Sequence, residues 1–262
     1  MSRNLDELFT LFAKNELPNL CENVDLFGFS ETPALSHHYE KSSLDLLSNY
    51  FFADFNISHF NEPARILFEL SYEAFDILIH AWMSELPIET QIINFGRRII
   101  SLAQCECSFD QKRRLAAKAV TDCGDENTLT VTNASEKVRH EARRMMGLLR
   151  FSPKNDIYIA HFTPDHLIIP ALGNFFAARF MKTSWAIIDD KRKLCLYSLQ
   201  GEKPHLCAVP SFVQNEKIST ETDEWEELWR HYFKTINNES RENKGLQRQF
   251  MPKRYWKYLT EL

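Results

Sequence analysis

The spacing of hydrophobic residues changes near residue 148, and this change limits the possible folds more than any other feature. Before it, apolar residues recur at steps of three and four along the chain, which predicts helices. Between 148 and 210 they alternate with polar residues, which predicts strands. The expected strands cover residues 156–162, 184–189, 193–198 and 205–209.

The connections between these strands define the expected sheet. Asp190-Lys191-Arg192 would join the second and third strands in an antiparallel hairpin, and a second turn covers residues 200–204. A helix that begins at Pro170 is inserted after the first strand. We therefore expect an α+β fold. A helical N-terminal half would pack on an antiparallel sheet with an inserted helix, closed by a C-terminal helix and a basic, aromatic tail.

Two further helices are expected on either side of the sheet. Asn133 stands three residues before Glu136 in a variant of the capping-box pattern. A helix should therefore start at Asn133 and run to about Gly147. An amphipathic helix should start at Asp223. Its apolar residues form one stripe that we expect to be buried in the core: Trp225, Leu228, Trp229, Tyr232, Phe233 and Ile236.

The chain has no linker or internal repeat that would divide it, so we expect a single domain over residues 1–262. The chain contains no run of about 20 apolar residues, the length that a membrane-spanning helix needs. The N-terminus lacks the apolar segment of a secretory signal, which favours a cytoplasmic location. Cys105 and Cys107 have the wrong spacing for a zinc site, and we expect neither a metal nor another cofactor.

Positive charge is concentrated near the C-terminus. Residues 241–257 carry six Lys or Arg and one Glu, a local charge of +5, and since the whole chain carries −5 the remainder carries −10. This contrast favours a partner that bears phosphate groups, and the aromatic rings among the cations could stack on bases. The alternative is a docked segment with solvated charges. The candidate contacts are Arg248, Lys253, Arg254, Tyr255 and Trp256, with Tyr258 as a further ring.

A second set of cations lies on the helix expected from Glu136. Arg139, Arg143 and Arg150 fall on one face of that helix, and Arg144 is adjacent in sequence. Such a row could follow a phosphate backbone, although a solvated helix would look the same. These four arginines are therefore further candidates for nucleic-acid contacts.

The loop between the first strand and the inserted helix is the candidate for chemistry. In Thr163-Pro164-Asp165-His166, a carboxylate beside an imidazole could act as an acid/base pair. The catalytic candidates are Asp165, His166 and Glu141. Helix capping by Asp165 and His166 is the alternative. No glycine-rich phosphate loop or nucleophile elbow accompanies them, so the sequence leaves open whether the protein is an enzyme.

The C-terminal motif is similar to a family signature. Residues 246–261 read LQRQFMPKRYWKYLTE. This string resembles the terminal signature of the bacterial "probable DNA metabolism protein" family, whose domain has no known function. Pro164-Asp165-His166, Trp185 and Asp189 are similar to the family pattern as well. The resemblance covers residues 70–262, whereas residues 1–60 form a divergent helical region and Arg143 stands where His is expected.

The resemblance implies a role in DNA metabolism. Family members occur alone or fused to a uracil-DNA-glycosylase-like domain, and they are commonly encoded beside a radical SAM protein assigned to DNA modification or repair. We therefore expect a DNA-binding accessory or repair component that works with a radical SAM partner. Two alternatives stay open. One is an enzyme acting on a damaged or modified base that is flipped out of the duplex, and the other is an adaptor whose charged tail binds an acidic protein.

Overall fold

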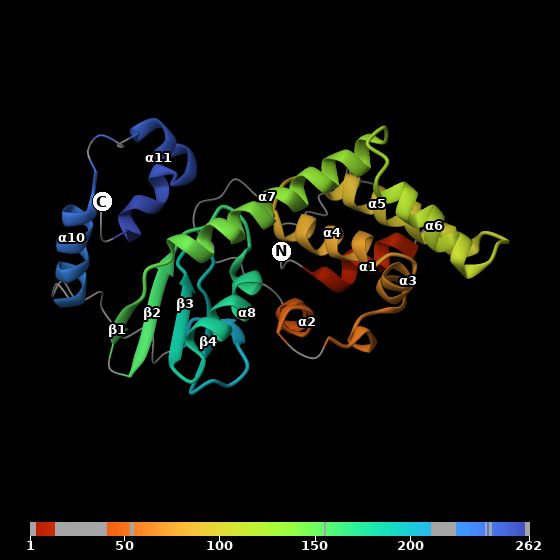
Figure 1. Cartoon of the computed structure of the whole chain (residues 1–262). Coiled ribbons are helices and arrows are strands. Elements are labelled where there is room, and N and C mark those ends of the chain that lie inside the picture. Colours follow the sequence, from red (N-terminus) through yellow and green to blue (C-terminus); the bar gives the residue numbers. More distant parts are fainter. Residues whose placement is uncertain are drawn as a thin grey trace. The chain divides into compact units, whose positions relative to one another are not determined.

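The computed structural model describes residues 4–13, 41–52, 55–154, 156–210, 224–238, 240 and 243–259. For residues 41, 42, 224–226, 254 and 257 it describes the backbone only. The chain divides into two compact units, and Figure 1 labels most of their helices and strands. The first unit comprises Met1–Glu141 with Asp165–Pro170, and the second comprises Ala142–Pro164 with Ala171–Leu262.

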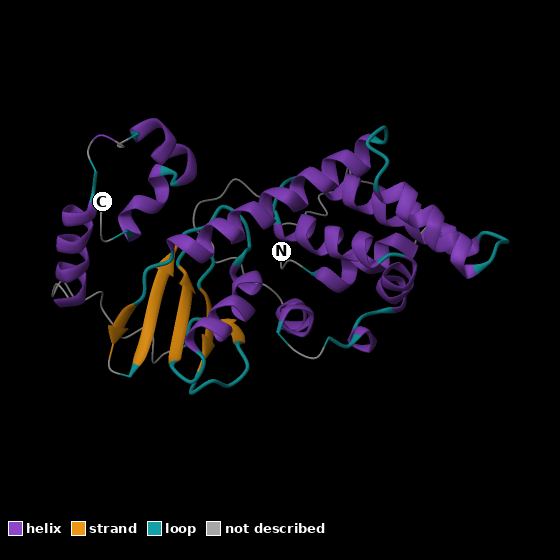
Figure 2. Ribbon diagram, in the orientation of Figure 1, coloured by secondary structure: helices purple, strands orange, loops and turns teal. Residues whose placement is uncertain are grey.

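In its described residues the first unit is built from helices alone (Figure 2). Its elements are α1 (Leu5–Ala13), α2 (Lys41–Phe51), η1 (Ile57–His59), α3 (Glu62–Leu70), α4 (Tyr72–Met83), α5 (Glu89–Ser101), η2 (Leu102–Gln104), α6 (Phe109–Val120) and most of α7 (Glu126–Leu148). From Ile77 to Met83 every residue of α4 is buried. A helix that is buried on all sides forms the centre of a helical core.

The N-terminal helix α1 is part of this core. Leu5 and Phe9 are fully buried, and Phe9 stacks on Phe75 of α4 with ring centroids 5.7 Å apart. The Phe12 ring lies against Gly96 of α5, where a Cβ atom would approach the ring carbons to 2.9 Å. Only glycine leaves room for this close approach.

Helix α7 begins earlier than the sequence pattern predicted. It starts at Glu126, where Oδ2 of Asp125 accepts hydrogen bonds from the backbone N–H of Thr128 at 2.8 Å and from its hydroxyl at 2.7 Å. Asn133 lies inside the helix, so the expected helix start at Asn133 was wrong. Asp125 caps the helix because it directly follows a turn and supplies a carboxylate to the first free backbone N–H groups.

The second unit contains a five-stranded sheet in the order β1-β2-β3-β4-β5. The strands are β1 (Ser152–Lys154), β2 (Ile157–Phe162), β3 (Ser184–Asp189), β4 (Leu194–Ser198) and β5 (His205–Ala208). This arrangement confirms the α+β class. Three neighbouring pairs are antiparallel, as expected, but β2 and β3 are parallel, so the purely antiparallel sheet was wrong. Helix α8 (Ile169–Phe180) forms the crossover between them.

Helix α8 covers one face of the sheet (Figure 2). Phe176 and Phe180 of α8 pack on Trp185 of β3, with ring centroids 6.2 and 6.3 Å apart. The hairpin between β3 and β4 is held by a fully buried ion pair, in which Arg192 donates to Asp189 at 2.8 Å. The same carboxylate also accepts hydrogen bonds from two backbone N–H groups of the turn, which confirms the expected hairpin.

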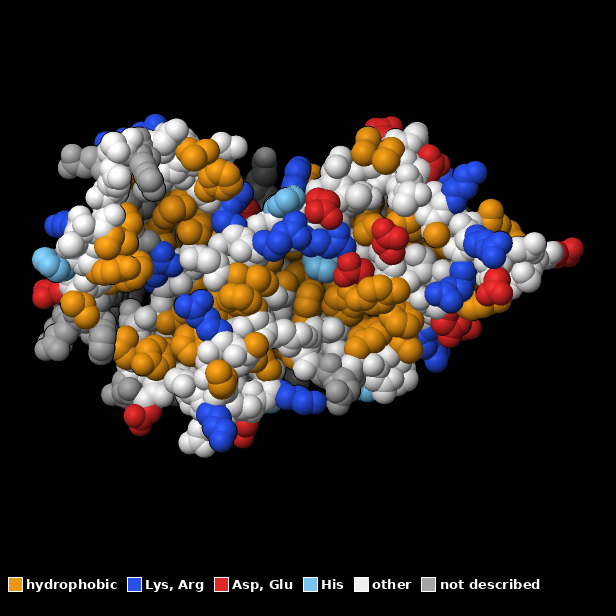
Figure 3. Space-filling view, viewed as in Figure 1, with side chains coloured by type: hydrophobic (Ala, Val, Ile, Leu, Met, Phe, Trp, Pro, Cys, Tyr) orange, Lys and Arg blue, Asp and Glu red, His pale blue; other side chains and the backbone are white. Residues whose placement is uncertain are grey.

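Among the described C-terminal residues, the second unit also contains α10 (Glu224–Ile236), α11 (Lys244–Phe250) and η4 (Lys253–Tyr258). The apolar stripe expected to be buried on α10 is largely exposed. Leu228, Trp229, Tyr232 and Ile236 have exposed fractions of 57%, 41%, 51% and 56%, so their assignment to the core was wrong. Figure 3 shows hydrophobic side chains on the surface along α10 and beside α11. An amphipathic period identifies an apolar face but not the surface that covers it. The side chain of Trp225 lies outside the description.

Candidate functional site

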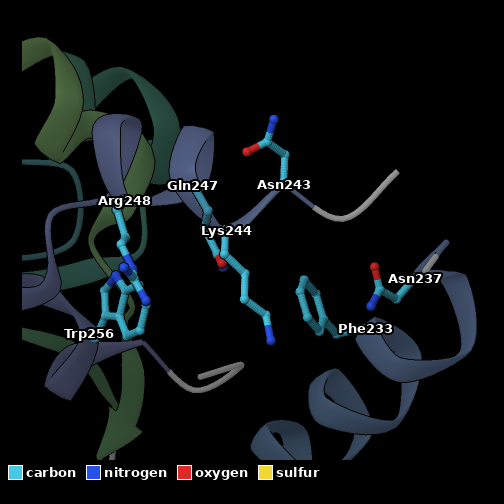
Figure 4. Close-up of a pocket in the computed structure, with 7 residues that line it drawn as sticks. All are labelled: Phe233, Asn237, Asn243, Lys244, Gln247, Arg248 and Trp256. Carbon is cyan, nitrogen blue, oxygen red and sulfur yellow. The ribbon is translucent and has the colours of Figure 1, made fainter. Parts of the chain in front are cut away.

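A pocket of about 410 Å³ lies among α10, α11 and η4 (Figure 4). It is lined by two aromatic, two cationic and three amide side chains: Phe233, Trp256, Lys244, Arg248, Asn237, Asn243 and Gln247. Arg248 and Trp256 lie on one side, Phe233 and Asn237 on the other, and Lys244 extends into the space between them (Figure 4). The pocket therefore brings together Arg248 and Trp256, two of the predicted contacts of the tail, with Phe233 of α10 and with Asn237, which directly follows that helix.

Short local hydrogen bonds fix the frame of this pocket. Asn243 caps α11, because its Oδ1 accepts from the backbone N–H of Leu246 at 2.9 Å. The indole N–H of Trp256 donates to the backbone carbonyl of Met251 at 2.7 Å. The preceding residue, Tyr255, is only 2% exposed and anchors η4 in the interior. Trp256 is thus held by its own hydrogen bond and by a buried neighbour.

The pocket has a positive charge balance. Two of its seven lining residues are cationic and none is acidic, although the chain as a whole carries a net charge of −5. Lysine and arginine bind phosphate oxygens, aromatic rings stack on bases, and carboxamides can both donate and accept hydrogen bonds. The arrangement therefore offers groups that suit each part of a nucleotide.

The other predicted tail residues have different surroundings. The buried ring of Tyr255 has no open face on which a base could stack. Lys253 is exposed at the start of η4, and the side chain of Arg254 lies outside the described residues. Tyr258 uses its hydroxyl in hydrogen bonds within the second unit. Of the predicted contacts in the tail, Arg248 and Trp256 are thus the two that line the pocket.

The arginines predicted on α7 are divided between the units. Arg139 belongs to the first unit, where it forms ion pairs with Asp76 and, at 2.8 Å, with Glu136. In the second unit, Arg143 is exposed and Arg144 is half-buried. The guanidinium of Arg150 donates to the carbonyl of Gly147 at 3.0 Å. Arg139 therefore has a structural role whether or not it also contacts a ligand.

Asp76 is the centre of the network that includes Arg139. Its carboxylate accepts a hydrogen bond from the hydroxyl of Tyr50 and lies 3.2 Å from Nδ1 of His80. Burial raises the pKa of Asp76, but the hydrogen bond and charge of His80, the hydrogen bond from Tyr50 and the charge of Arg139 together lower it to about 2. Burial and the Asp76 charge raise the pKa of Tyr50, which therefore stays a hydrogen-bond donor.

The predicted catalytic loop lies in the first unit and is held by Glu141. The buried carboxylate of Glu141 accepts hydrogen bonds from the backbone N–H groups of Asp165 and His166, both at 2.9 Å. Nδ1 of His166 lies 2.6 Å from the carbonyl oxygen of Ser84. The three predicted residues are thus brought together, with Glu141 and His166 both bonded to backbone groups. These contacts favour a structural role for Glu141, and a catalytic role for Asp165 or His166 stays a prediction.

A different His–Asp pair lies at the carboxyl ends of the parallel strands. Nδ1 of His161, near the end of β2, lies 3.0 Å from Oδ1 of Asp190, which follows β3. The hydroxyl of Tyr258 donates to Oδ2 of Asp190 at 3.3 Å and also bonds with the hydroxyl of Thr163. Both members of the pair are accessible, with side-chain exposures of 29% and 36%. A carboxylate on Nδ1 leaves Nε2 as the nitrogen that can exchange a proton.

Sequence reasoning missed this pair because the two residues are far apart in the chain. The available signal was the helix between the two strands, since a crossover of that kind makes the strands parallel and places their carboxyl ends together.

In the described part of the chain, no group of three His, Cys, Asp or Glu side chains is placed to hold a metal ion. None of the helices within the described ranges combines the length and apolar character of a transmembrane segment.

Comparison with known proteins identifies a family for most of the chain. No curated protein and no solved structure matches it. A family model matches residues 102–261, a region that runs from η2 through the sheet to the pocket and η4. Because this match covers more than half of the sequence, the chain belongs to the family described as a domain of unknown function, DUF4130.

Proposed function

We propose that this chain is a DNA-binding accessory component of DNA metabolism or repair that works with a radical SAM partner. The observation that supports DNA binding is the pocket of Figure 4, with its two cations, two aromatic rings and three amides. The resemblance of residues 246–261 to the DNA metabolism signature supports the biological setting and the radical SAM partner.

The composition of the pocket favours a nucleic acid over an acidic protein as its ligand. An acidic peptide would satisfy Lys244 and Arg248, but it would gain little from the two rings and three amides that line the same pocket. A nucleotide uses all three kinds of group, because phosphate, base face and base edge each have a partner. The net negative charge of the rest of the chain would direct such a ligand to this region.

The test is DNA binding by fluorescence anisotropy over a series of salt concentrations. Each phosphate contact adds about 0.7 to the log-affinity versus log-salt slope on single strands and about 0.9 on duplex DNA. The double substitution Lys244→Ala with Arg248→Ala should therefore flatten the slope by about 1.4 or 1.8, respectively. The matched control is Arg114→Ala with Lys118→Ala, two exposed cations of α6 in the first unit, which should leave the slope unchanged. Wild-type protein without DNA affinity at about 50 mM salt would refute the proposal.

The His161–Asp190 pair favours a second candidate function, an enzyme that acts on a damaged or modified base. His161 would exchange a proton through Nε2, and Asp190 would orient the ring. The test is product formation on oligonucleotides that carry uracil, hypoxanthine or 8-oxoguanine. If a product forms, its loss in His161→Ala but not in His166→Ala would assign the chemistry to this pair. The opposite result would assign it to the loop at residues 163–166.

A further inference from the structure

We infer that the pocket holds one unpaired base of a single-stranded DNA, stacked between Trp256 and Phe233, while Lys244 and Arg248 bind the adjoining phosphates. This inference rests on the proposed function and narrows it from DNA in general to single strands. It also assigns a separate role to each side of the pocket.

The two rings form opposite sides of the pocket. Trp256 comes from η4 and Phe233 from α10, and in Figure 4 the flexible side chain of Lys244 extends between them. A base that enters this space would displace that side chain toward a phosphate. Trp256 is fixed by its hydrogen bond to Met251 at 2.7 Å and by the buried Tyr255 beside it. A ring that is already fixed loses little conformational entropy when a base stacks on it.

The dimensions of the pocket and the geometry of DNA both favour an unpaired base. A volume of about 410 Å³ lies at the lower end of the range for small-molecule pockets, and a double helix cannot enter such a space. Within a duplex, both faces of each base are covered by neighbouring bases. A base can therefore contact two protein rings only after it has left the stack.

The polar groups are placed to serve the rest of the nucleotide. Asn237 and Gln247 can donate and accept hydrogen bonds at a base edge. Asn243 uses its oxygen to cap α11, which leaves its amide nitrogen as a donor. Lys244 extends between the rings, and Arg248 lies beside Trp256 (Figure 4). The phosphates that adjoin an inserted base would thus have two flexible cations as partners.

The experiment compares three probes on the intact protein at one salt concentration. The probes are an oligothymidine of about twelve nucleotides, within the site size of single-strand binding folds, its duplex with oligoadenosine, and an abasic strand of the same length. We expect the oligothymidine to bind at least about tenfold more tightly than either other probe, since stacking contributes a factor of about ten to a hundred per base. Thymidine monophosphate should compete only at far higher concentration, because it carries one phosphate where a nucleotide within a strand is flanked by two.

Substitution of Trp256 tests the stacking role. Trp256→Ala should remove the preference for oligothymidine over the abasic strand, whereas Trp256→Phe should retain most of it. Binding should quench tryptophan fluorescence in the wild type but not in Trp256→Phe. Trp229→Ala is the matched control, because this exposed residue of α10 does not line the pocket. Thermal unfolding of each variant shows whether a loss of binding follows from a loss of folding.

The outcomes separate this inference from the proposed function. Equal or tighter binding of the duplex or of the abasic strand would overturn the single-strand inference and leave DNA binding intact. Quenching that persists in Trp256→Phe, or thymidine monophosphate that competes as well as the oligonucleotide, would also overturn it. Failure of all three probes to bind at low salt would refute the proposed function itself.

Discussion

Replacing Asp76 should destabilise the helical unit strongly, because this carboxylate joins three helices. Asp76 on α4 accepts a hydrogen bond from Tyr50 of α2, pairs with Arg139 of α7 and lies beside His80. Its side chain is 23% exposed and that of Arg139 is 20% exposed. Asp76→Ala would leave Arg139 without one carboxylate partner and Tyr50 without its carboxylate acceptor, both in a largely buried setting.

The structure gives two routes to the size of this effect. The gap between the ordinary pKa of 3.8 and the folded value of about 2 corresponds to about 2 kcal/mol of unfolding free energy. Removing one partner of a buried ion pair costs about 3–5 kcal/mol, and partial exposure of this pair lowers that cost. We therefore expect Asp76→Ala to lower the free energy of unfolding by about 2–4 kcal/mol at neutral pH.

The effect should also depend on pH in a defined direction. Because the pKa of Asp76 is lower in the folded state than in the unfolded state, its contribution to stability is complete above about pH 5, well above the ordinary pKa of 3.8. The contribution is lost as the pH falls toward about 2, where the folded carboxylate takes up a proton. The difference in stability between wild type and Asp76→Ala should therefore shrink between about pH 5 and pH 2.

The assay is urea unfolding followed by circular dichroism, repeated over this range of pH. The matched control is Glu73→Ala, which removes an exposed carboxylate from the same helix and should cost at most about 1 kcal/mol. An Asp76→Ala variant as stable as Glu73→Ala would refute the reasoning, as would a stability difference that does not change with pH.

Three further predictions concern the fold. Gly96→Ala should lower the free energy of unfolding by about 1–3 kcal/mol, because the added Cβ atom would press on the Phe12 ring. Phe12→Leu should relieve that cost, and a double-mutant cycle measured by urea unfolding would test this. Trp229→Ala should change the free energy of unfolding by no more than about 1 kcal/mol, since Trp229 is 41% exposed, and a much larger loss would restore its assignment to the core. A fragment of residues 1–147 should fail to fold stably, because it lacks Leu167, whose backbone N–H bonds to Met83 at 2.9 Å and whose side chain is fully buried. A stable fragment in limited proteolysis would contradict both this expectation and the single domain that the sequence predicted over residues 1–262.

The hydrophobic period predicted the elements of the sheet better than their pairing. The four expected strands correspond to β2, β3, β4 and β5, because alternation reports directly which residues face a core. The parallel pairing of β2 and β3 could also have been predicted. A connection of more than twenty residues that contains a helix is the usual link between parallel strands, and β2 ends at Phe162 while β3 begins at Ser184. The short strand β1 has too few residues to show any period.

The pocket could be predicted only in part, because its residues come from separate elements. Charge and aromatic content were sufficient to identify Arg248 and Trp256 in the tail. Phe233 was assigned to a buried stripe, since the period of a helix cannot distinguish a residue facing a pocket from one facing the core. Gln247 was noted only as part of the C-terminal signature, and Asn237 gave no signal at all. An amide becomes informative only when tertiary packing places it beside other groups, and that packing is not encoded in local spacing.

The His161–Asp190 pair illustrates how one error in strand direction can hide a site. In an all-antiparallel sheet, the end of the first strand and the end of the second would lie at opposite edges, and these two residues would be far apart. In the parallel arrangement the backbone N–H of Asp190 donates to the carbonyl of Phe162 at 3.0 Å, which places the side chains of His161 and Asp190 within hydrogen-bonding distance. The carboxyl edge of parallel strands is where ligands bind in α/β sheets. NMR of the His161 ring, in the wild type and in Asp190→Asn, would therefore test the contact independently of any reaction, since loss of the carboxylate beside Nδ1 should change the chemical shift of that nitrogen.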